Sequence, residues 1–176
     1  MTSNILVLGT DHRFQTKSSE FSNGDHEAFD KFVRKLVVRH GVLAIAEELS
    51  PQALSEAGVE HSVPEHIARS LGKVHRYCDP DKGERRALGI RNEADIRGLE
   101  LPRRQLSEVE VQEKVGLSHR LRGEFWLREL LNLNIWPTIF VCGANHTESF
   151  TNVLSSGGLS SEIVARDWAP DSSVGT

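Results

Sequence analysis

The stretch Ile-Leu-Val-Leu-Gly-Thr-Asp-His at residues 5–12 joins a short apolar run to a glycine and, three residues later, a histidine. Residues 138–146, Thr-Ile-Phe-Val-Cys-Gly-Ala-Asn-His, repeat this order of features. Short continuous apolar runs are typical of strands buried on both faces of a parallel sheet. The carboxyl ends of parallel strands lie at the same edge of a sheet, so we expect His12 and His146 to converge on one pocket.

Three further apolar runs are predicted to be strands, at residues 42–46, 74–78 and 161–165. Helical patterns separate the runs, with Asp25 expected to cap a helix that ends near His40. Two shorter helices are expected near residues 64–71 and 147–154. This alternation predicts an α/β fold in three layers, with a mainly parallel sheet of about five strands and helices on both faces.

The chain has 176 residues, a length that fits a single α/β domain spanning residues 1–176. A charged, mostly helical insertion is expected near residues 84–134, with breaks at Gly98, Pro102 and Gly116. The tail from Pro170 to Thr176 is expected to fray.

The overall charge gives no reason to expect a nucleic acid partner, because 21 basic and 25 acidic residues leave a net charge of −4. The chain starts without the basic and apolar regions of a signal peptide and has no run of about 20 apolar residues, so we expect no membrane partner. The two cysteines, Cys78 and Cys142, indicate no disulfide scaffold and favour a cytoplasmic location. A small-molecule or peptide-like substrate is expected, and the sequence leaves open whether the chain forms a homo-oligomer.

Ionisable side chains follow four different predicted strands: His12, Glu47 or Glu48, Asp79 or Asp81, and His146. Successive side chains of an extended chain point to opposite sides, so one of Glu47 and Glu48 is expected to face the pocket. We prefer Glu47 because it is nearer the strand. The ordinary alternative for each position is a solvated or capping residue.

Two histidines and a carboxylate suit hydrolytic chemistry by two schemes. His12 and His146 can hold a divalent metal ion, whose bound water has its pKa lowered towards about 7. Without metal, a histidine paired with a glutamate can act as the general base for water while the other histidine stabilises developing negative charge. The sequence does not choose between these schemes.

Other residues near the strand ends have weaker functional interpretations. Gly9 and Gly143 are expected to allow sharp turns and a close approach of the backbone to a ligand. Asp79 can orient a histidine, and Arg85 and Arg86 can bind a substrate carboxylate or phosphate; a turn before a charged helix is the favoured alternative. A thiol at Cys142 beside His146 suits packing better than nucleophilic attack.

The Gly-Thr-Asp-His and Gly-Ala-Asn-His motifs, with a glutamate after the second strand, resemble the TraB/PrgY/GumN/TIKI group and the related erythromycin esterase and ChaN-like proteins. That resemblance implies an α/β fold and a metal-dependent protease, an esterase or a haem-binding protein. His12 and His146 would be the motif histidines, and Glu47 or Glu48 the motif carboxylate. This chain differs from the group in its length and in its charged region at 84–128.

Two function hypotheses follow. The first is a soluble hydrolase that activates water with His12, His146 and Glu47 or Glu48, with or without a divalent metal. The second is a non-catalytic protein that binds a small anionic ligand or has a regulatory role on the same scaffold. A dinucleotide-binding oxidoreductase is disfavoured because the loop after the first strand lacks the Gly-x-Gly-x-x-Gly spacing.

Overall fold

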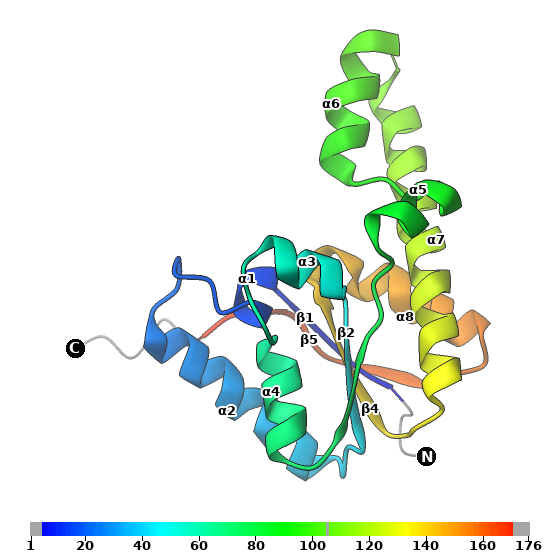
Figure 1. Cartoon of the computed structure of the whole chain (residues 1–176). Helices are drawn as coiled ribbons and strands as arrows, with labels where there is room; N and C mark the ends of the chain where they lie inside the picture. The colour runs from blue at the N-terminus through cyan, green and yellow to red at the C-terminus, as the bar shows by residue number, and fades with distance from the viewer. Residues whose placement is uncertain (1–4, 105, 171–176) are drawn as a thin grey trace.

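A computed structural model describes residues 5–104 and 106–170, so the expectations for the first four residues and for the tail at 171–176 lie outside the described residues. Five strands form one sheet in the order β3-β2-β4-β1-β5, and every neighbouring pair is parallel (Figure 1). The strands are β1 (Ile5–Thr10), β2 (Ala44–Glu47), β3 (Val74–Tyr77), β4 (Thr138–Gly143) and β5 (Ser161–Trp168). The predicted α/β fold with five strands is confirmed.

Helices cover both faces of this sheet. They are α1 (His12–Gln15), α2 (Asn23–Arg39), α3 (Pro51–Glu56), α4 (Val63–Ser70), α5 (Lys82–Leu88), α6 (Glu93–Arg104), α7 (Glu108–Leu133), the 3-10 helix η1 (Ala144–His146) and α8 (Thr147–Ser156). The short helices α1 and α3 are not among the elements predicted from the sequence, because neither is long enough to show a helical repeat. Ser22 caps α2, and Asp25 is the third helical residue of the capping box rather than the cap.

The strands of the sheet centre are buried on both faces, which explains their uninterrupted apolar sequences. Leu6 and Leu8 of β1 pack on the side of α2 and α4, whereas Ile5 and Val7 pack on the side of α7 and α8. The largest buried side chains on these faces include Phe29 of α2, Ile67 of α4, Trp126 of α7 and Phe150 of α8. The architecture is therefore a three-layer α/β/α arrangement.

A helical hairpin projects beyond the sheet, formed by α6 and the first half of α7 (Figure 1). Ile96, Val111 and Val115 form a small apolar cluster between the two helices. The expected breaks are wrong, since α6 includes Gly98 and Pro102 and α7 continues through Gly116. An exposed helical glycine costs only about 1 kcal/mol relative to alanine, which a long capped helix tolerates. No helix in residues 5–104 and 106–170 has the length and apolar character needed to cross a membrane.

Candidate functional site

The carboxyl ends of β1, β2 and β4 meet at one edge of the sheet, because β4 lies between the other two strands. His12 follows β1 at the start of α1, where the Asp11 carboxylate accepts a hydrogen bond from the Arg13 amide at 2.9 Å and caps the helix. His146 follows β4 at the end of η1. His12 Nε2 and His146 Nε2 lie 3.6 Å and 3.3 Å from the same oxygen, Glu48 Oε1. The structure therefore brings the two histidines and one glutamate together.

Glu48 is a buried carboxylate with two differently placed oxygens. The Gly143 amide donates a hydrogen bond to Oε2 at 2.9 Å. Arg122 Nη1 lies 2.7 Å from Oε1, to which no described residue donates a well-directed hydrogen bond. The backbone of β4 fixes one oxygen, and the two imidazoles and the guanidinium surround the other.

Glu47 lies on the other side of β2, so the preference for Glu47 over Glu48 beside the histidines is wrong. Ile45 packs on the side of α2 and α4 and Ala46 on the side of α7, and the alternation places Glu47 with the former and Glu48 with the latter. Glu47 instead accepts hydrogen bonds from Gln15 Nε2 at 2.9 Å, from His75 Nε2 at 2.8 Å and from the Ser62 hydroxyl.

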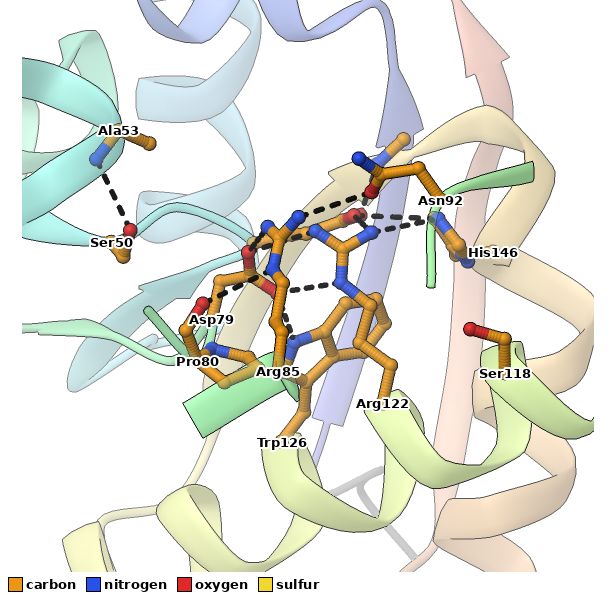
Figure 2. Close-up of polar contacts among 12 residues, drawn as sticks. Ser50, Ala53, Asp79, Pro80, Arg85, Asn92, Ser118, Arg122, Trp126 and His146 are labelled. Carbon is orange, nitrogen blue, oxygen red and sulfur yellow. Dashed lines mark hydrogen bonds and ion pairs between the residues drawn. The ribbon is translucent and has the colours of Figure 1, made fainter. Parts of the chain in front are cut away.

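Arg122 of α7 connects the site to Asp79, which follows β3. Its Nε and Nη2 atoms donate to the two oxygens of Asp79 at 2.7 and 2.8 Å, and Trp126 Nε1 donates to Asp79 Oδ1 at 3.0 Å. Figure 2 shows the Arg122 side chain between Asp79 and His146. Burial raises the pKa of Asp79, but the hydrogen bonds and charge of Arg122 and the charge of Arg85 outweigh burial and lower it. Asp79 is therefore an ionised anchor for Arg122.

This arrangement places Asp79 and Arg85 in an internal ion pair rather than at a substrate, whereas substrate binding by Arg86 stays a prediction. Arg85 forms an ion pair with Asp79 and donates to Asn92 Oδ1 at 3.1 Å (Figure 2). Asp79 contacts two arginines and a tryptophan, and it orients a histidine only through Arg122. Arg86 is exposed and lines a surface hollow of about 500 Å³.

His146 is neutral at pH 7. Burial lowers its pKa to about 4, with a further lowering by the nearby Arg122 and opposition from Glu48. Its ring meets the rings of Trp126 and His119 edge to face, with centroids 5.3 and 4.4 Å apart. Burial also lowers the pKa of His119, a half-buried histidine of α7 that the sequence patterns did not single out.

The residues present do not fit the expected divalent metal. Arg122 Nη1 lies 2.7 Å from Glu48 Oε1 and 3.4 Å from His146 Nε2, so a guanidinium fills the space where an ion would need to lie about 2 Å from both groups. No group of three His, Cys, Asp or Glu side chains in the described part of the chain has the arrangement of a metal site. Arg122 supplies the positive charge beside Glu48 instead.

The glycines of the two motifs make room for other parts of the protein, a role different from the expected sharp turns and close approach to a ligand. Both glycines lie within strands. A Cβ atom on Gly143 would lie 2.7 Å from His12 Nε2, whereas one on Gly9 would lie 2.0 Å from the Arg166 carbonyl oxygen. Gly143 therefore allows the His12 ring to lie against β4, and Gly9 allows β5 to approach β1.

Cys142 packs in the core between the sheet and α7, and burial raises the pKa of its thiol. A thiolate nucleophile is disfavoured there because the apolar surroundings do not solvate its charge. This placement agrees with the packing interpretation.

A scan against protein-family models finds no match, and searches of the curated proteins and of the solved structures find no similar protein. The resemblance to the TraB/PrgY/GumN/TIKI group stays a hypothesis that rests on the two Gly-x-x-His motifs.

Gln15 and Arg122 are site residues that the sequence patterns did not indicate. A usable signal exists for each. Gln15 is three residues after His12 and so lies on the same helical turn, and Arg122 is four residues before the buried Trp126. Both spacings become informative only when the neighbouring residue is known to lie at the site.

Alanine at the two glycines is expected to have different effects. Gly9→Ala forces a methyl group into the backbone of β5 and should destabilise the fold by roughly 1–3 kcal/mol or more. Gly143→Ala meets the end of the half-exposed His12 side chain, which can rotate away, so stability should change little while the His12 ring leaves Glu48. Urea unfolding measures the first effect and the NMR signals of the His12 ring measure the second. A Gly143→Ala protein with unchanged His12 signals would contradict the contact.

The buried neutral His146 predicts a specific pH dependence of stability. Its pKa is lower in the folded chain, about 4, than in the unfolded chain, about 6.5. The unfolded chain binds the extra proton first as the pH falls, so this contribution to stability is present above about pH 6.5 and is lost by about pH 4, to the extent of about 3 kcal/mol. Urea unfolding of wild type and His146→Gln between pH 7 and 4 should show the larger decrease in wild type, and equal decreases would contradict the prediction.

Proposed function

We propose that this protein is a hydrolase whose site is centred on Glu48, with His12 as the general base that activates water without a metal ion. The observation that supports it is the approach of His12 Nε2 and His146 Nε2 to one buried carboxylate oxygen. The side chain of His12 is 45% exposed, whereas that of Glu48 is fully buried. Water and substrate therefore reach the site from the side of His12.

His12 takes a proton from water as the water oxygen attacks the carbonyl carbon of an ester or peptide-like substrate. The imidazolium that forms lies beside the negative charge of Glu48, which stabilises it. The proton then passes to the leaving group, which restores neutral His12. In this reaction the Glu48 carboxylate acts as a stabilising charge, and Gly143 and Arg122 hold that carboxylate in place.

The developing negative charge on the substrate oxygen requires a cationic or hydrogen-bonding group. His146 is neutral because burial lowers its pKa to about 4. Arg122 carries a permanent charge, and although burial opposes this charge, the negative charges of Glu48 and Asp79 raise its pKa. Arg122 therefore fits this role better than His146, whose Nε2 lies 3.4 Å from Nη1 of the guanidinium.

The alternative of a binding protein for a small anion has less support. Arg85 pairs with Asp79 and donates to Asn92, so its charge is already compensated within the protein.

The test is hydrolysis of a panel of p-nitrophenyl esters and peptide p-nitroanilides by the purified protein, with and without EDTA. Turnover is expected, EDTA should not change it, and His12→Ala should lower kcat by about 10²–10⁴. His66→Ala, at an exposed position on α4, is the matched control and should keep full activity.

Turnover that His12→Ala leaves intact would contradict the role of His12, and inhibition by EDTA would contradict the metal-free scheme. Absence of turnover across the panel, with saturable binding of an anion, would favour the binding protein.

A further inference from the structure

Gln15 is a fully buried amide that lies between Glu47 and the half-exposed His12. Its Nε2 donates to Glu47 Oε2 at 2.9 Å, and its Oε1 lies 2.8 Å from His12 Nδ1. Because the amide is shielded from water, these two contacts are its hydrogen-bonding environment at both ends.

Chemistry fixes the direction of this chain of hydrogen bonds. Glu47 also receives the Ser62 hydroxyl and His75 Nε2, so it is a buried carboxylate surrounded by donors, and an ionised carboxylate only accepts. The amino group of Gln15 must therefore face Glu47, which leaves the carbonyl oxygen of Gln15 facing His12. That oxygen is an acceptor, so Nδ1 of His12 carries the hydrogen.

The protonation state of His12 Nε2 follows from that of Nδ1. A neutral imidazole has one protonated nitrogen, so a hydrogen on Nδ1 leaves the lone pair on Nε2. Nε2 is the atom that lies 3.6 Å from Glu48 Oε1 and nearest the Cβ position of Gly143. The two carboxylates at the end of β2 thus lie on opposite sides of the same imidazole.

We propose that Gln15 is a positioning residue that transmits the acceptor character of Glu47 to His12 and holds His12 in the Nδ1–H tautomer, with its basic nitrogen at the site. This inference deepens the proposed function, on which its catalytic meaning rests. Free histidine prefers the opposite tautomer, with the hydrogen on Nε2, so without Gln15 the lone pair would move to the nitrogen that points away from the site.

The network that holds Gln15 draws on several elements of the fold. Glu47 is at the end of β2, His75 lies in the edge strand β3, and Ser62 caps α4. Ser62 also accepts a hydrogen bond from the Glu65 amide at 3.1 Å, so its hydroxyl hydrogen is free to point to Glu47. The orientation of the amide is therefore determined by a buried carboxylate that also accepts from β3 and from the cap of α4.

The experiment is NMR of protein labelled with ¹⁵N at histidine, in which the chemical shifts and ring couplings of each imidazole show which nitrogen is protonated. His12→Ala assigns the His12 signals. A titration in the same sample identifies a pH at which His12 is neutral. In wild type, His12 should be in the Nδ1–H form. In Gln15→Leu, which keeps the bulk and removes both hydrogen bonds, the population should shift to the Nε2–H form.

Gln112→Leu is the matched control, because Gln112 is an exposed helical glutamine that bonds to a neighbouring glutamate. It should leave the His12 tautomer unchanged. An Nε2–H tautomer in wild type would overturn the proposal, and so would an Nδ1–H tautomer that persists in Gln15→Leu. If Gln15→Leu does not fold, the wild-type spectrum alone decides, since the inference fixes its outcome.

The tautomer readout needs no turnover, so this proposal and the hydrolase proposal fail separately. Where the wild type hydrolyses an ester of the panel, Gln15→Leu should lower kcat by about 10- to 100-fold, as is typical of groups that orient an imidazole, with little change in KM. An equal kcat with a changed tautomer would contradict a role of Gln15 in the reaction.

Discussion

A negative charge buried at the end of a central strand is the constraint on which this structure depends. Glu48 has no access to water, and an uncompensated buried carboxylate costs several kcal/mol. The β4 amide of Gly143 and the guanidinium of Arg122 compensate it. Arg122 in turn needs Asp79, so a chain of alternating charges connects the ends of β2 and β3 to α7.

Burial on both sides of β2 produces two polar networks from adjacent glutamates. The Glu48 network is made of α7, β4 and η1, whereas the Glu47 network is made of α1, β3 and α4. His12 touches both, because Nδ1 contacts Gln15 and Nε2 faces Glu48. The His12 side chain is also exposed to solvent, which gives it the access to water that a general base needs.

The sequence predicts the layers, the five strands and the meeting of His12 with His146, because apolar runs and strand ends are local features with a fixed geometric meaning. It does not predict which glutamate faces the histidines, since that choice depends on which side of β2 the helix α7 packs. The role of Arg122 is equally non-local: its partners Glu48 and Asp79 are distant in the sequence. Short helices such as α1 show no helical repeat in the sequence, so pattern analysis does not predict them. Gln15 lies in α1 and was not predicted for the same reason.

The glycines of the two motifs also show the difference between what the sequence predicts and what depends on packing. Their recurrence before a histidine was informative about position, but the physical reason differs between them. Gly143 makes room for an imidazole, whereas Gly9 makes room for a neighbouring strand. Sequence spacing locates such residues, and only the packing around them shows which contact excludes a side chain.

The most direct test of the central claim is a double-mutant cycle between Glu48 and Arg122, measured by urea unfolding at pH 7. Glu48→Gln and Arg122→Met should each destabilise the fold, the latter by about 3–5 kcal/mol because it leaves the buried Glu48 carboxylate without its arginine. The double variant should be more stable than the sum of the two effects predicts, by about 1–3 kcal/mol. Additive effects, within about 0.5 kcal/mol, would show that the two side chains do not interact and would contradict the account.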